Sequence, residues 1–117
     1  MKVIIDLLED MREHIKNAPD YSILSVLLKE DEQGEMQRVG EKPVKSVRLD
    51  ETNKTLVFGF LEEGVVSQTL IEMINKLPNE AMMYEVVLEI SSEHERMPII
   101  GFGENHDEKQ FALFVQA

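Results

Sequence analysis

The sequence predicts an α+β fold in which two α-β-β-β units form a mostly antiparallel sheet of about six strands, with two helices on one face. Two stretches show the helical periodicity of apolar residues, and a proline follows each of them. Short apolar segments separated by polar turns come after each helix, which is typical of strands. The 117 residues favour a single domain, residues 1–117, with a modest core.

The first helix is expected over residues 2–16. Pro19 ends it, because proline disfavours helical backbone at the residue before it. Its apolar stripe consists of Ile4, Leu7, Leu8, Met11 and Ile15. Strands are then expected at 21–30, 36–40, 43–49 and 54–61. The first of these strands is apolar on both faces, as expected of a central strand.

A second helix is expected over residues 66–77, with Ser67 as a possible N-cap and Pro78 after its end. Its stripe consists of Val66, Leu70, Ile74 and Leu77. Three strands follow, at 84–90, 98–103 and 110–115. In the first of them apolar and acidic residues alternate, which predicts one buried and one solvated face.

An internal repeat relates the two halves. Residues 43–60 align without a gap to residues 98–115, so that Lys54 matches Lys109. Large apolar residues recur at the same phase: Leu56, Phe58 and Phe60 match Phe111, Leu113 and Val115. The repeats span about 2–61 and 66–117. Because one unit alone would bury its apolar face poorly, we expect the two units to share a core.

The second half also carries the stretch TLIEMINKLPNEAMMYEVVLEI, followed by MPIIGFG and KQFALF. This pattern resembles small uncharacterised bacterial and phage proteins built on an α-β-β-β unit: a short leucine-rich helix, the pair LP, a strand, an acidic turn and further strands. The resemblance covers residues 69–115 and, more weakly, 7–60. It implies a bacterial or mobile-element origin and a repeated unit, and it implies no catalytic residue.

Composition narrows the classes of partner. Lys and Arg number 12 against 23 Asp and Glu, a formal net charge of −11. Nucleic acids and anionic membranes are therefore not expected as direct partners, since like charge opposes the encounter. There is no cysteine, which fits a reducing compartment. With no export signal and no stretch of about 20 apolar residues, we expect a cytoplasmic protein.

No pattern of catalytic, cofactor-binding or metal-binding residues is evident. His94 and His106 are expected in turns at opposite ends of one strand, roughly 20 Å apart, too far to share an ion. The acidic run KEDEQGE lacks the spacing of an EF-hand. Gly101 and Gly103 do not open a helix, as a dinucleotide fingerprint requires. We therefore expect no enzyme, no cofactor and no metal.

The leading hypothesis is a non-enzymatic interaction module that self-associates through an apolar sheet face or an edge strand. The contact residues expected on the uncovered face are Val57, Leu61, Met83 and Val87.

Two alternatives stay open. An acidic decoy could bind the nucleic-acid surface of a basic partner through Glu30, Asp31, Glu32, Glu35, Asp107 and Glu108. A small-ligand sensor or an enzyme would require a concave pocket with converging polar groups.

Overall fold

The computed structural model describes residues 2–14, 21–60, 67–89 and 95–116. Ile15, Pro19, Leu61, Val66 and His94, which figure in the expectations above, lie outside these ranges. The two helices are α1 (Ile4–His14) and α2 (Ser67–Asn75), and a short 3-10 helix, η1 (Asn79–Met83), follows α2. The strands are β1 (Ser22–Glu30), β2 (Met36–Pro43), β3 (Ser46–Asp50), β4 (Thr55–Gly59), β5 (Glu85–Glu89), β6 (Arg96–Asn105) and β7 (Gln110–Gln116).

The strands form one mixed sheet of seven strands in the order β2-β1-β7-β6-β5-β4-β3. The expectation of about six, mostly antiparallel strands is met only in part: the sheet has seven strands and is mixed, with four antiparallel and two parallel pairs. Consecutive strands joined by turns pair antiparallel, but β1 pairs parallel to β7, and β4 pairs parallel to β5. Both parallel pairs join strands from different halves of the chain, and hairpin signals in the sequence do not report such contacts.

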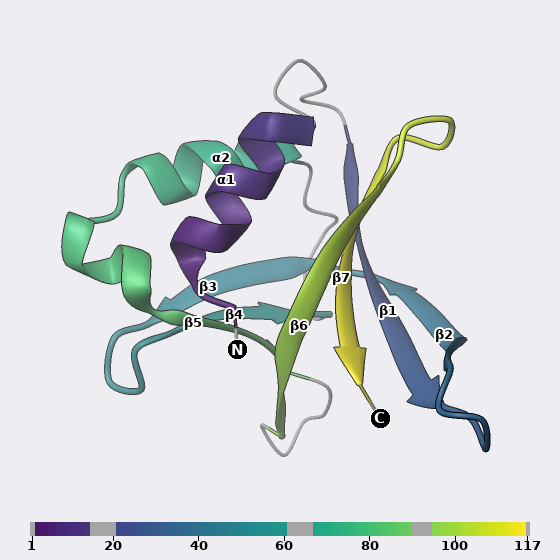
Figure 1. Ribbon diagram of the computed structural model, residues 1–117. Coiled ribbons are helices and arrows are strands. Elements are labelled where there is room, and N and C mark those ends of the chain that lie inside the picture. The colour runs from purple at the N-terminus through teal and green to yellow at the C-terminus, as the bar shows by residue number, and fades with distance from the viewer. Residues whose placement is uncertain (1, 15–20, 61–66, 90–94, 117) are drawn as a thin grey trace.

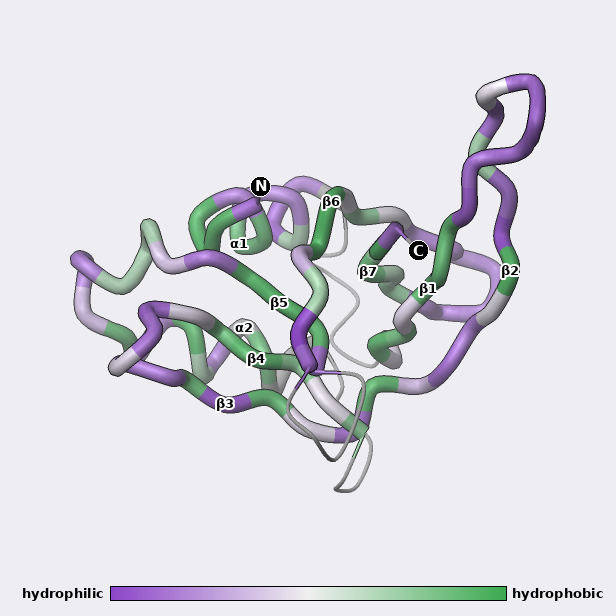
Figure 2. Tube along the Cα trace, turned by 90° about the horizontal axis from the view of Figure 1, so that it is seen from below, coloured by the Kyte–Doolittle hydropathy of each residue, from purple (hydrophilic) through white to green (hydrophobic). Residues whose placement is uncertain are grey.

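The sheet curls so strongly that its two ends are joined by the chain itself. β2 and β3 stand at opposite ends of the strand order, yet only Val44 and Lys45 separate them. The N–H of Val44 donates to the carbonyl of Ile23 in β1 (2.9 Å), and that of Lys45 donates to the carbonyl of Gly59 in β4 (2.8 Å). Figure 2 shows the strands running round from β3 through β5 and β7 to β2.

Both helices lie on the same side of β3, β4 and β5, and α1 packs across α2 (Figure 1). The apolar stripe of α1 faces the inner side of the curled sheet, where Ile4, Leu7 and Met11 are fully buried. The N–H of Val3 donates to the Asp6 carboxylate (2.9 Å) at the start of this helix, which satisfies an otherwise unpaired donor. Neither helix in the described ranges is long and apolar enough to cross a membrane.

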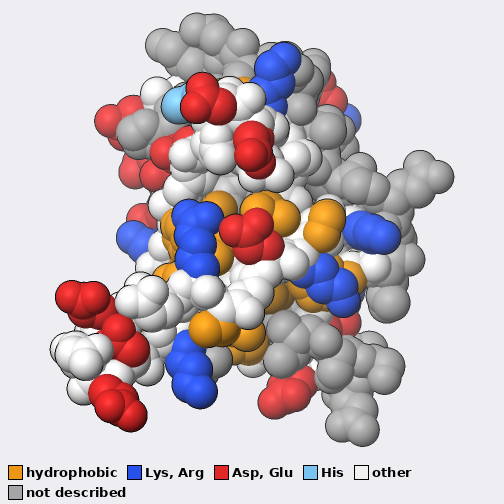
Figure 3. All heavy atoms as spheres, turned by 90° about the vertical axis from the view of Figure 1, so that its right-hand side faces the viewer, with side chains coloured by type: hydrophobic (Ala, Val, Ile, Leu, Met, Phe, Trp, Pro, Cys, Tyr) orange, Lys and Arg blue, Asp and Glu red, His pale blue; other side chains and the backbone are white. Residues whose placement is uncertain are grey.

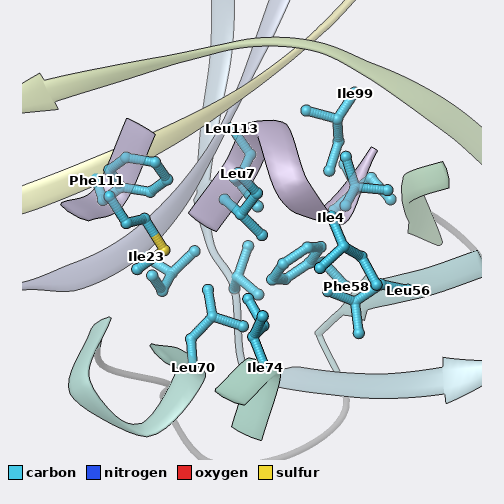
Figure 4. Packing of buried hydrophobic residues seen from close by; sticks show 14 of the residues in the cluster. Ile4, Leu7, Ile23, Leu56, Phe58, Leu70, Ile74, Ile99, Phe111 and Leu113 are labelled. Carbon is cyan, nitrogen blue, oxygen red and sulfur yellow. The ribbon is translucent and has the colours of Figure 1, made fainter. Parts of the chain in front are cut away.

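The core fills the space between the helices and the inner face of the sheet (Figure 4). Its largest fully buried side chains include Phe58, Phe111, Ile4, Leu7, Met11, Ile23, Leu56, Leu70, Ile74, Ile99 and Leu113. Alternation along β4 and β7 points Leu56, Phe58, Phe111 and Leu113 inward, as the period of two predicts. A smaller cluster of Leu24, Val26 and Ala112 lies on the outer face of β1 and β7.

Candidate functional site

Two of the residues expected to contact a partner, Val57 and Val87, face each other across the parallel β4–β5 pair. Both are buried, with exposed fractions of 2% and 5%. Met83, the last residue of η1, is 70% exposed, and Leu61 lies outside the described residues. The two valines offer almost no area to a partner, so a binding surface on this molecule must be built from other side chains.

An arginine network, made of Arg48, Asp50, Thr55, Glu89 and Arg96, lies on the same outer face as these valines. Arg96 in β6 is paired with Glu89 in β5, but its guanidinium reaches Asp50 in β3 (2.9 Å) and the hydroxyl of Thr55 in β4 (3.2 Å). Its stem must therefore cross β5 and β4 on the face where the valines point. Long basic side chains commonly cover apolar surface in this way.

The six acidic residues of the decoy hypothesis divide between two turns. Glu30, Asp31, Glu32 and Glu35 end β1 or follow it, whereas Asp107 and Glu108 precede β7. Ser22 pairs with Gln110 and Leu28 with Gln116, so the two turns lie at opposite ends of the β1–β7 pair (Figure 1). Roughly 25 Å of strand separates them. The structure does not bring these carboxylates into one patch.

Asp31 has a structural role within its own turn. Its carboxylate accepts hydrogen bonds from the N–H groups of Gln33 and Glu35, each at 2.9 Å. The bond from Glu35 is the main reason that the pKa of Asp31 is lowered. This carboxylate is thus used to close the β1–β2 turn, which is a common function of aspartate at such positions.

His106 lies at the start of the β6–β7 turn and contacts Tyr21. The Tyr21 hydroxyl is hydrogen-bonded to Nδ1 of the His106 ring, and the two rings meet edge to face. Among the described residues, no three His, Asp or Glu side chains converge as a metal site would require. His106 therefore ties the turn to the start of β1 in this structure.

An outer groove of about 470 Å³ lies beside His106, on the outer face of β1, β7 and β6. Leu24, Ala112 and Gly103, which are paired across the three strands, form its floor. Its lining is completed by Arg38, Glu104, Asn105, His106, Asp107 and Gln110. Next to the groove the Phe114 ring lies over Gly103, where a Cβ would be 2.8 Å from a ring carbon.

A second concavity, the apolar pocket, opens on the inner face and measures about 290 Å³. It is lined by Leu27, Phe60, Leu88, Met97 and Val115, together with Ser25, Gly40, Glu41 and Lys42. These residues come from β1, β2, β5, β6 and β7, with Phe60 just after β4. No sequence motif marks it, because the pocket is produced by the curvature of the sheet.

β2 is the most exposed strand among those described: all eight of its residues are exposed. It pairs with β1 on one side, where a register shift between Leu27 and Leu28 leaves Val39 as an extra residue. Arg38 and Glu41 form an ion pair at 3.3 Å, and the Arg38 guanidinium stacks 5.6 Å above Phe114. Figure 3 shows this side of the molecule, with hydrophobic side chains beneath basic and acidic ones.

Comparison of the chain with protein-family models, curated proteins and solved structures found no match. The function is therefore inferred from the geometry of β2, the outer groove and the apolar pocket.

Proposed function

We propose that this chain is a non-enzymatic interaction module that self-associates by pairing the free edge of β2 with β2 of a second copy. The observation that carries the proposal is that β2 is self-complementary. One edge of this strand is bonded to β1, and none of its eight residues is buried. Such an edge presents backbone donors and acceptors to another strand.

The bulge at Val39 decides which residues share a face. Arg38 lies opposite Leu28, and Glu41 lies opposite Val26. Leu28 and Val26 are two residues apart and point the same way. Arg38 and Glu41 therefore also point the same way, although they are three residues apart, because Val39 is an extra residue between them.

A twofold axis between Val39 and Gly40 makes this arrangement complementary to itself. It sets Arg38 of each copy opposite Glu41 of the other, and it sets Met36 opposite Pro43. An isologous interface repeats every such contact twice. The bulge would disturb pairing with a regular strand, whereas a second β2 carries the same bulge at the same place.

The dimer should be weak. Pairing one strand of eight residues buries less than the roughly 1,200 Å² of a standard stable interface. Within one chain the Arg38–Glu41 pair is exposed, at 59% and 50%, so exchanging it for the intermolecular pair costs little. We expect a dissociation constant in the micromolar range.

Charge reversal tests the proposal directly. Arg38→Glu places two glutamates opposite each other in both halves of the interface, and Glu41→Arg places two arginines there. Each single variant should weaken dimerisation at least tenfold, because like charges opposite each other in a sheet are destabilising. The double variant restores opposite charges and should recover the wild-type constant within about threefold. Sedimentation velocity from about 5 to about 500 µM covers the expected range.

Glu51→Arg is the matched control, since Glu51 is exposed in the β3–β4 turn and the change in net charge equals that of Glu41→Arg. It should leave the sedimentation profile unchanged. A wild-type chain that stays monomeric throughout this range would contradict the proposal, as would single variants that dimerise like wild type.

We further propose that the fold consists of two α-β-β-β units, with β2 as an additional strand in the first of them. In support, the first strand of each half pairs in parallel with the last strand of the other half, β1 with β7 and β5 with β4. The aligned residues Lys54 and Lys109 both adopt φ of 54°, a conformation uncommon outside glycine. Because the sequence contains no cysteine, we place the module in the reducing cytoplasm.

A further inference from the structure

The apolar pocket continues the main core to a part of the inner face that is open to solvent. Leu88 and Val115 belong to the buried core, and Leu27, Phe60 and Met97 pack against it. Ser25 holds the rim in place, since its hydroxyl donates to the Lys42 carbonyl at 2.9 Å. The volume of about 290 Å³ is near the lower limit for small-molecule pockets.

Among the described residues that line the pocket, Lys42 is the cation at the inner rim. The Lys42 ammonium lies 4.4 Å from the centre of the Phe60 ring, a contact that orients it over the apolar lining. In the part of the chain that the structure describes, Lys42 forms no ion pair. The neighbouring Glu41 is bonded to Arg38, on the outer face. The ammonium is therefore available to a negative group at the mouth of the pocket.

We infer that the apolar pocket binds a small amphipathic anion, a carboxylate on a hydrocarbon chain of about ten carbons. The chain fills the space between Leu27, Leu88 and Val115, and the carboxylate meets Lys42. The charge pairs of the proposed dimer, Arg38 with Glu41, are on the outer face, whereas this pocket is on the inner face. Lys42 nevertheless belongs to β2, and the proposed twofold places it opposite Gln37 of the second copy.

The test compares decanoate, decanol and decyltrimethylammonium by amide chemical-shift titration, with the two ionic compounds below their critical micelle concentrations and decanol below its solubility limit. Decanoate should bind with a dissociation constant on the order of 10–100 µM, shifting the amides of Leu88 and Met97. The net charge of −11 favours the cation at long range. A preference for decanoate therefore reports the local ammonium. The Arg38→Glu variant serves as background, so that self-association does not complicate the titration.

Two variants separate the charge from the cavity. Lys42→Gln should weaken the binding of decanoate about fivefold and leave the binding of decanol unchanged. Gly40→Leu should weaken both at least tenfold, because a Cβ at Gly40 meets only the Leu27 Cβ, at 4.0 Å, and a longer side chain fills the pocket. Lys29→Gln is the charge-matched control and should have no effect. The inference would be overturned if all three compounds bound equally or if the cation bound more tightly. It would also be overturned if Lys42→Gln left the binding of decanoate unchanged.

Discussion

Replacement of Phe58 by alanine should lower the free energy of unfolding by about 3–5 kcal/mol. Phe58 is fully buried in β4, and its ring lies among the side chains that join the helices to the sheet (Figure 4). Truncation removes the transfer free energy of the ring and leaves a cavity that rigid strands on both sides cannot fill. Urea unfolding followed by circular dichroism measures the loss.

Phe60→Ala is the matched comparison, because Phe60 is only half-buried and faces the apolar pocket. This variant should lower the free energy of unfolding by about 1–2 kcal/mol, since folding removes less apolar area from water at Phe60 than at Phe58. Similar losses for the two variants would show that the ring of Phe58 is not enclosed as the structure places it.

The position of Phe58 in the core was predictable from the sequence. Leu56 and Phe58 fall on one phase of a period-two pattern, and so do Phe111 and Leu113 in the second half. All four are fully buried. Local periodicity reports which face of a strand is apolar, and it is independent of which strand lies alongside.

Sheet order could not be predicted in the same way. The contacts β1–β7 and β4–β5 join segments about 90 and 30 residues apart, and no turn residue specifies them. β2 and β3 are separate strands because the chain passes from one end of the curled sheet to the other at Val44 and Lys45. The bulge in β2 belongs to its pairing with β1. The apolar pocket and the outer groove result from the curvature of the sheet, so they could not be predicted from the sequence either.

The uncovered face illustrates a different limit. Val57 and Val87 do point away from the helices, as their phase predicts, because Leu56, Phe58, Val86 and Leu88 point toward them. The sequence does not show what lies over this second face. Long basic side chains can reach across two strands, and Arg96 does so. The one indication in the sequence was Arg96 itself, a long basic residue at the start of the strand that follows β5.

Arg96→Met should remove the polar contacts of this covering side chain while keeping most of its stem. The guanidinium forms ion pairs with Asp50 and Glu89, whose side chains are 13% and 11% exposed. The Arg96 side chain is itself 23% exposed. Its removal takes one donor from each carboxylate, while Asp50 keeps its bonds from Asn53 and Glu89 keeps its bond from Arg48. At neutral pH the loss should therefore be moderate, but larger than that of an exposed ion pair. Arg48→Met, at a side chain 50% exposed, is the control and should cost about 0.5 kcal/mol.

The loss in Arg96→Met should depend on pH. Two hydrogen bonds from Asn53 (3.1 and 2.9 Å), and after them Arg96, lower the pKa of Asp50 from 3.8 to about 2. Since the folded-state pKa is the lower one, ionised Asp50 stabilises the fold above pH of about 4, and this contribution is lost as the pH falls toward about 2. The difference between wild type and Arg96→Met should therefore shrink over that interval.

Asp50→Asn provides the check on this assignment, because its side chain does not titrate. On this background the Arg96→Met loss should be smaller at pH 7, and its dependence on pH between about 4 and 2 should flatten. Urea unfolding of the four chains of this double-mutant cycle at pH 7 and near pH 3 gives both quantities. A loss that is the same at both pH values with Asp50 present would mean that the Asp50 contact contributes nothing to the stability of this face, and that Arg96 acts through the Thr55 hydroxyl, which carries no charge at either pH.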